Sequence, residues 1–231
     1  MTYITKQRCK LVIATCCVLA SGLVLAQSAP TSKVEVPTIK VGDAWTFDRT
    51  DGLKNVKEYT SLVTVTAVTD TEMRSTATRS DNGQIATIIR NKELNRLATE
   101  TTIGKSVADP YYPSYSFPLE IGKTWDKEVT FTRSNEPDWK VVTSLKGRVV
   151  GWEKVTVPAG SFNALRIEVL GFYHGWKGSA SGAGRWSGRS IDTAWYAPEV
   201  KNIVKSIYEE SGGAMYSSKV IFELVEYKLV Q

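Results

Sequence analysis

Alternating apolar and polar positions predict that most of this chain forms β-strands. In residues 63–67, valine or alanine alternates with threonine, which is the pattern of a half-buried strand. No long amphipathic helix is indicated, although residues 92–99 suit a short helix as well as a strand or a loop. Further runs are rich in Val, Ile, Thr and aromatic residues, as strands are; they cover residues 85–90, 128–132, 139–150, 164–173, 190–196, 202–209 and 219–229.

Turn-forming sequences separate these runs at short intervals. Asp-Asn-Gly at 81–83, Pro-Ala-Gly at 158–160 and Ser-Gly-Gly at 211–213 favour tight reversals, because Gly and Asn accept positive φ and Pro presets φ. Residues 178–188 contain four glycines and suit the tip of a hairpin. Short strands joined by such turns predict an all-β or mostly β fold, a single antiparallel barrel or strongly curved sheet over residues 39–231.

One short element occurs twice in the chain. Residues 39–45 (Ile-Lys-Val-Gly-Asp-Ala-Trp) resemble residues 119–125 (Leu-Glu-Ile-Gly-Lys-Thr-Trp). In each, a Gly turn precedes a strand that begins with Trp. A duplicated half-domain and a local turn-and-strand device used twice both explain this echo, and its shortness favours the local device.

The N-terminal segment predicts export. Three basic residues within the first ten positions precede an apolar stretch over 11–25, and Ala26 offers a small residue for cleavage, which together make a secretory signal peptide. The apolar stretch is short for a membrane-spanning helix. We therefore expect cleavage after Ala26, a periplasmic or secreted protein, and no transmembrane segment. Residues 27–38, rich in Ser, Pro, Thr and Lys, are expected to form a flexible leader.

All three cysteines, Cys9, Cys16 and Cys17, lie in this N-terminal segment, so the mature chain forms no disulfide. Lipid modification at Cys16 or Cys17 is the alternative to simple cleavage. It normally requires Gly, Ala or Ser before the cysteine, whereas Thr15 and Cys16 stand there. Cleavage also removes three positive charges and no negative one from the net charge of +5. The weak charge that remains gives no reason to expect a nucleic-acid partner.

Two stretches in the C-terminal half resemble a known family. Residues 155–168 (VTVPAGSFNALRIE) are similar to a V-P-A-G-T-F-x-A-x-R-I hairpin, and residues 195–205 to a W-Y-x-P-x-V-G-x-V-K strand-turn-strand. With the earlier Gly-x-x-Trp element, they resemble the TapB-like proteins, relatives of an exported bacterial family of unknown function, over most of residues 37–229. Lys201 and Asn202 stand where the family has Gly, which suggests Asn202 in a left-handed turn. The resemblance implies a β-rich exported protein and brings no catalytic residues.

Residue types limit the chemistry of the mature chain. A single histidine, His174, and no cysteine remain, which excludes a thiol nucleophile and a zinc site built from several Cys or His ligands; no metal and no cofactor are expected. Residues 184–188 (GRWSG) miss the nucleophile-elbow pattern by one position. Paired carboxylates for glycoside hydrolysis are an alternative, although solvated strand faces also explain the acids on neighbouring predicted strands: Glu199, Glu209, Glu210, Glu223 and Glu226.

The strongest candidate for ligand contact is the segment 173–189, which mixes aromatic and basic side chains with Gly and Ser. A hairpin of this composition can contact an anionic glycan or a lipid head group by stacking and charge pairing; a solvated connector is the alternative. A second aromatic segment, 111–118, either lines a cavity or covers a barrel end. The candidate contact residues are Tyr173, Trp176, Lys177, Arg185, Trp186 and Arg189.

Together these features favour an exported, non-catalytic binding or envelope-assembly protein. Such a protein would hold a lipid, another apolar ligand or a segment of a partner on a curved sheet. The partners expected are therefore a lipid, a glycan or an envelope protein. The alternative is a carboxylate-dependent periplasmic hydrolase acting on envelope glycan, which needs two acids in one cleft and a raised pKa on at least one of them.

Overall fold

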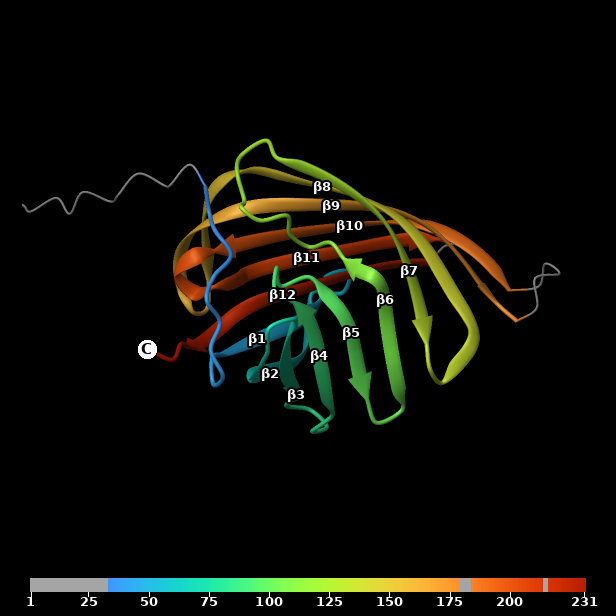
Figure 1. The fold of residues 1–231 in the computed structure, drawn as a ribbon, viewed down its shortest axis with the longest axis horizontal. Helices are drawn as coiled ribbons and strands as arrows, with labels where there is room; N and C mark the ends of the chain where they lie inside the picture. Colours follow the sequence, from blue (N-terminus) through green and yellow to red (C-terminus); the bar gives the residue numbers. More distant parts are fainter. Residues whose placement is uncertain (1–32, 179–183, 214–215) are drawn as a thin grey trace, which may run out of the picture. The chain divides into compact units, whose positions relative to one another are not determined.

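The computed structural model describes residues 33–178, 184–213 and 216–231, which form a closed antiparallel β-barrel (Figure 1). The predicted all-β barrel is thereby confirmed, and the predicted signal peptide with its cysteines lies outside the described residues. The strands are β1 (Ala44–Asp51), β2 (Val56–Val68), β3 (Glu72–Arg79), β4 (Ile85–Asn91), β5 (Arg96–Thr101), β6 (Gly104–Tyr112), β7 (Thr124–Arg133), β8 (Glu136–Val157), β9 (Gly160–Lys177), β10 (Arg185–Ala197), β11 (Asn202–Gly212) and β12 (Tyr216–Lys228), with a 3₁₀ turn, η1 (Pro198–Val200), between β10 and β11.

Each strand pairs with the next one in the sequence, and β12 closes the barrel against β1. Every connection is thus a reversal between antiparallel neighbours, which explains the regular recurrence of turn-forming residues between the apolar runs. No helix in the described ranges has the length and apolar character needed to cross a membrane.

The echo found in the sequence marks the start of two halves, β1–β6 and β7–β12, that repeat each other. In the first half the amide of Gly42 donates to the carbonyl of Val65 at 2.9 Å, and in the second the amide of Gly122 donates to the carbonyl of Val149 at the same distance. The two tryptophans also correspond. The indole N–H of Trp45 donates to a backbone carbonyl at 2.8 Å, as does that of Trp125 at 2.9 Å.

Two irregularities in the strand pairing recur at matching places in the two halves, whereas the shifts between β5 and β6 and between β1 and β12 have no counterpart. The register shifts between β2 and β3 just after Val65, and between β8 and β9 just after Val149. It shifts again between β4 and β5 after Ile89, and between β10 and β11 after Trp195. A local turn-and-strand device does not explain matched bulges this far along the chain. The duplication, which the sequence alone left as the less favoured interpretation, therefore describes the barrel better.

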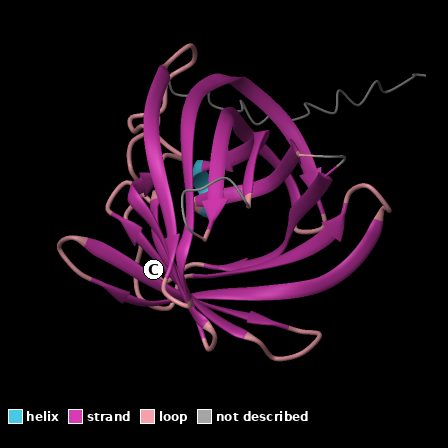
Figure 2. Ribbon diagram, turned by 90° about the vertical axis from the view of Figure 1, so that its right-hand side faces the viewer, coloured by secondary structure: helices cyan, strands magenta, loops and turns pink. Residues whose placement is uncertain are grey.

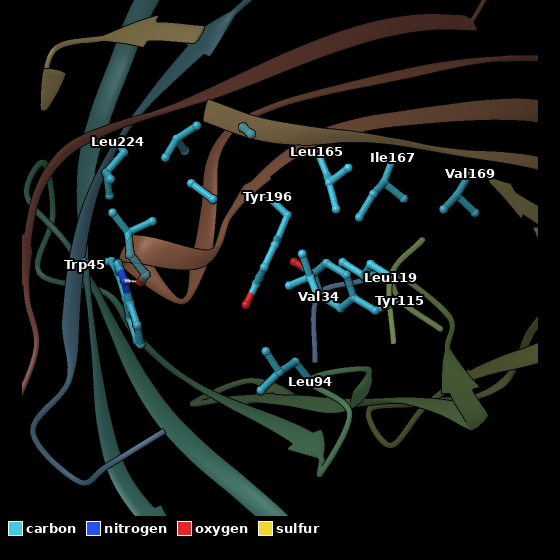
Figure 3. Packing of buried hydrophobic residues seen from close by; sticks show 14 of the residues in the cluster. Val34, Trp45, Leu94, Tyr115, Leu119, Leu165, Ile167, Val169, Tyr196 and Leu224 are labelled. Atoms are coloured by element: carbon cyan, nitrogen blue, oxygen red, sulfur yellow. Dashed lines mark hydrogen bonds between the residues drawn. The ribbon is translucent and has the colours of Figure 1, made fainter. Parts of the chain in front are cut away.

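A hydrophobic plug fills the barrel at the end where η1 lies. Tyr196 is the largest fully buried side chain, and its ring meets that of Tyr115 edge-on at a centroid distance of 5.7 Å (Figure 3). Val34, from the expected leader, is buried too and pairs with Leu119 in an isolated bridge, so this part of the leader is held against the barrel. The plug comprises Val34, Trp45, Tyr115, Leu119, Leu165, Tyr196, Val200 and Leu224.

Two local expectations need correction. The residue in the left-handed conformation after η1 is Lys201 (φ 56°) and not Asn202, because the Lys201 amide closes the turn on the carbonyl of Pro198 at 3.1 Å. Gly188 belongs to β10 and not to a hairpin tip; residues 179–183 of the expected tip lie outside the described ranges. The ambiguous segment 92–99 is a turn followed by the start of β5.

Candidate ligand-binding site

The barrel encloses a cavity of about 1000 Å³, here called the lumen cavity. Figure 2 looks along the barrel and shows η1, in cyan, behind the strands that surround the lumen. Aliphatic and aromatic side chains make up much of the lining, together with a few charged groups. Pockets for small apolar ligands have this composition and volumes of about 300–1,000 Å³. The apolar lining includes Trp45, Met73, Leu94, Phe131, Trp139 and Trp186.

Aromatic and basic side chains form one end of the lumen cavity. The rings of Trp139 and Trp186 lie 6.3 Å apart, and the guanidinium of Arg133 lies 4.0 Å from the centre of the Trp139 ring. Glu136 accepts hydrogen bonds from both Arg133 and Lys177. The positive charges at this mouth are thus matched by a carboxylate and an aromatic face.

A second set of charges lies farther in, where four lumen-lining side chains form a row across neighbouring strands. Met73 on β3 is the cross-strand partner of Arg90 on β4, Arg90 is the partner of Arg96 on β5, and Arg96 is the partner of Tyr112 on β6. All four line the lumen cavity. Like charges directly opposite each other in a sheet repel, so this wall holds an excess of positive charge.

The two arginines have few partners. Arg96 stacks on Tyr112, with 5.2 Å from its guanidinium to the ring centre. Burial lowers the pKa of Arg90; Tyr115 opposes this effect and the charge of Arg96 adds to it, and no carboxylate acts on it. Arginine nonetheless stays protonated in proteins. Among the residues that the structure describes, neither side chain has an ion-pair partner within 4.0 Å.

The opposite wall supplies an acidic group. The hydroxyl of Tyr112 reaches across the lumen and donates to Asp192 on β10 at 3.3 Å. Burial raises the pKa of the Asp192 carboxyl to about 6, against the opposing effects of the Tyr112 hydrogen bond and the charge of Arg96. The same burial raises the pKa of the Tyr112 phenol well above its ordinary value, which keeps Tyr112 a donor at neutral pH.

The Asp192→Asn variant is expected to change how stability depends on pH. The carboxyl holds its proton more tightly in the folded barrel than in the unfolded chain. The free energy of unfolding therefore falls as pH rises from about 4 to about 6, and the loss persists above that range. Since Asp192 also borders the cavity, we expect a modest penalty of about 1–3 kcal/mol. The free energy of unfolding of the variant should equal that of the wild type at pH 4 and exceed it by this amount at pH 7.5.

Urea unfolding at several pH values measures this difference. The exposed carboxyl of Asp126 provides the control, because Asp126→Asn should leave the pH profile of the wild type unchanged. Identical profiles for Asp192→Asn and the wild type would show that Asp192 is well solvated.

The structure divides the six predicted contact residues between the two faces of the barrel wall. Tyr173 and Trp186 line the lumen cavity. Lys177 lies at the mouth of the cavity, where it forms an ion pair with Glu136. The remaining three, Trp176, Arg185 and Arg189, occupy the alternate positions of their strands, whose side chains point outward. The predicted patch is therefore not one surface. Of the aromatic segment 111–118, Tyr112 and Tyr115 line the cavity, and Tyr115 also belongs to the plug.

Of the five predicted acids, Glu210 alone lines the lumen cavity. Glu209 and Glu223 form ion pairs with lysines at 3.1 and 2.8 Å, and Glu199 and Glu226 are exposed. Within the described residues, no cluster of three or more His, Cys, Asp or Glu side chains is placed to hold a metal ion. The single histidine is exposed and stacks on Trp176.

The sequence analysis missed Arg90, Arg96 and Asp192, which are among the charged groups that line the lumen cavity. A signal was available for the first of them, since Arg90 lies at the end of a predicted strand whose neighbours are isoleucines. That the two arginines face each other, and that Asp192 faces Tyr112, depends on the strand register and on a contact between residues 80 positions apart.

The sequence matches no protein-family model and no curated protein. Among solved structures, a protein described as exported and as having a YmcC-like fold, from Bacteroides fragilis, matches with a TM-score of 0.50 and 15% identity over 84% of this chain and 99% of its own. The barrel has a YmcC-like fold. A protein described as a lipoprotein from Parabacteroides distasonis (TM-score 0.48, 13% identity, 84% of this chain and 99% of its own) and the hypothetical lipoprotein YmcC from Escherichia coli (TM-score 0.45, 10% identity, 80% and 84%) are also similar. The YmcC-like fold is thus the part of the expected family resemblance that is found, and the TapB-like assignment is not confirmed.

Proposed function

We propose that this protein is an exported, non-catalytic binding protein that holds an apolar ligand inside its barrel. The lumen cavity is the observation that carries the proposal. Side chains just fill the interior of a barrel of about eight strands, and more strands enclose a wider interior; this twelve-strand barrel packs a plug at one end and leaves about 1000 Å³ beyond it. Aromatic side chains at the mouth suit a passage between water and an apolar interior.

Export is the second part of the proposal. The basic, apolar and small-residue pattern of residues 1–26 supports it, and the structurally similar Bacteroides fragilis protein is described as exported. We propose that the protein acts in the periplasm or outside the cell, where it would carry a lipid or support envelope assembly.

Native and denaturing mass spectra of the protein purified from the periplasm test both parts. We expect the denatured mass to correspond to residues 27–231 and the native mass to exceed it by that of an apolar ligand lost on denaturation. A denatured mass that retains residues 1–26 would contradict cleavage after Ala26. A native mass without any ligand, from protein that also fails to bind an added neutral apolar probe, would contradict the carrier and direct attention to protein partners.

A carboxylate-dependent hydrolase acting on envelope glycan is the second candidate, and one observation favours it. Asp192 and Glu210 line the same cavity, and burial raises the pKa of Asp192 to about 6, as a general acid requires. The surrounding apolar walls and the two arginines suit an amphiphile better than a sugar. Release of reducing ends from envelope glycan that is abolished in Asp192→Asn would favour the hydrolase.

A further inference from the structure

The charged row in the lumen specifies what kind of apolar ligand would fit. We propose that Arg90 and Arg96 bind the acidic head group, a carboxylate or a phosphate, of an amphiphile whose apolar chain fills the rest of the lumen cavity. This inference rests on the proposed function, because it requires a ligand inside the barrel.

The first argument is the unmet charge. Arg90 and Arg96 are direct cross-strand partners, so two positive side chains lie together on the cavity wall, with Arg90 half-buried and Arg96 exposed. No carboxylate acts on Arg90, which lines the cavity. Like charges that face each other across two strands repel, and partial burial of Arg90 adds a desolvation cost. A carboxylate or phosphate between the two guanidinium groups would relieve this cost through paired N–H···O bonds, the geometry that arginine favours.

The second argument is that the fold does not require these arginines. When the halves are matched by their strands and bulges, Met73 corresponds to Leu165, Arg90 to Tyr196 and Arg96 to Ile203. Within each set of three, neighbouring residues are cross-strand partners. The set of the second half packs into the hydrophobic plug or directly against it. The same backbone is therefore stable with apolar side chains at these positions, which points to a role for Arg90 and Arg96 in binding.

A third polar group on this wall is also without a partner. Ser75 on β3 is completely buried, lines the lumen cavity, and its hydroxyl has no hydrogen-bond partner among the described residues. It lies two positions along the inward face from Met73. Ser75 pairs with Val65 at the bulge between β2 and β3, and Ile167 pairs with Val149 at the corresponding bulge between β8 and β9, so Ile167 is the matching residue of the second half. Ser75 is thus placed to donate a further hydrogen bond to an acidic head group.

The rest of the cavity suits the chain of such a ligand. From the arginine row, apolar side chains continue along the walls through Phe131, Val141 and Leu145 to Trp139 and Trp186 at the mouth. The head group would be held at the inner row and the chain would extend toward the aromatic mouth. A neutral lipid of the same length would fill the same path but leave both arginines unpaired.

Competition against a neutral fluorescent probe, N-phenyl-1-naphthylamine, tests the inference on the mature protein. Three competitors share a twelve-carbon chain and differ only in the head group: dodecanoate, dodecyl phosphate and dodecan-1-ol. We expect at least one of the two anions to displace the probe at a concentration at least tenfold lower than the alcohol, and the stronger of the two identifies the head group as carboxylate or phosphate.

Two single variants locate the effect. Arg90→Gln and Arg96→Gln should each remove the advantage of the anions over the alcohol by about tenfold, because each removes a charge-assisted pair. Binding of the neutral probe should be unchanged, which also shows that the variant barrel is folded. Arg148→Gln is the matched control, since Arg148 is exposed on β8 and pairs with Glu168; it should behave like the wild type.

The outcomes separate this inference from the proposed function. Failure of the wild type to bind the neutral probe would overturn the apolar carrier and this inference together. Probe binding with equal competition by the alcohol and both anions would overturn only the inference. An anion preference that survives in both Arg90→Gln and Arg96→Gln would also overturn it, because the head group would then lie elsewhere.

Discussion

Replacing Asp43 with alanine is expected to lower the free energy of unfolding by about 3–5 kcal/mol, because a buried ion pair would lose one partner. Asp43 is completely buried just before β1. Its carboxylate accepts hydrogen bonds from the amides of Lys40 at 2.9 Å and Val230 at 2.7 Å, and it lies 3.6 Å from the ammonium group of Lys201. One side chain thus ties together the turn before β1, the C-terminal residues and the turn after η1.

Urea unfolding followed by tryptophan fluorescence measures the effect of Asp43→Ala. The conservative variant Asp43→Asn keeps an acceptor for one amide but loses the charge opposite Lys201, so its cost should be intermediate. The control is Asp126→Ala, at an exposed carboxylate near the start of β7, which should change stability by less than about 0.5 kcal/mol. A loss below 1 kcal/mol in Asp43→Ala would mean that water replaces the carboxylate at this corner.

Two substitutions at Tyr196 are expected to change stability in opposite directions. Tyr196→Ala removes a completely buried ring that contacts Tyr115 and Phe117, each at a centroid distance of 5.7 Å. The cavity left behind should cost about 3–5 kcal/mol. The Tyr196 hydroxyl is buried without a hydrogen-bond partner among the described residues, so Tyr196→Phe removes a desolvated polar group and should stabilise the barrel by about 1 kcal/mol.

Thermal and urea unfolding of both variants check this pair of predictions. Tyr227→Phe serves as the control, since Tyr227 is 39% exposed and its hydroxyl can reach water. A clear destabilisation by Tyr196→Phe would reveal a partner for the hydroxyl in solution. A small effect of Tyr196→Ala would show that the plug repacks around the missing ring.

The barrel could be predicted from the sequence because eight of its strands contain clear apolar or alternating runs and its turns contain Gly, Pro and Asn. Strand β1 was expected only from the echo that ends at Trp45, and β3, β5 and β6 were not among the predicted runs. Their inward positions include Ser75, Arg96 and Tyr112, which face a cavity with polar groups. Alternation identifies a strand when its inward face is apolar, so it misses these three strands, whereas Arg90 and Asp192 lie on strands that their other residues identify.

The candidate site could be predicted only in part for a related reason. Tyr173 and Trp186 were chosen by composition, and alternation along their strands sends both into the lumen. The same rule sends Trp176 to the other face, and a composition argument cannot tell the two faces apart. The partnership of Arg90 with Arg96 depends on a bulge after Ile89, and a shift of one residue would have pointed one of them outward.

The duplication of the barrel lets its two halves evolve under different constraints. A single six-strand unit would expose two sheet edges, which invite aggregation, and a second copy removes both. Once the copies are joined in one chain, they need not remain alike. The second half contributes Leu165, Tyr196 and Ile203 to the packed end of the barrel, whereas the first half has Met73, Arg90 and Arg96 at the matching positions. The second half thereby stabilises the fold, and the first half can vary in the side chains that would select a ligand.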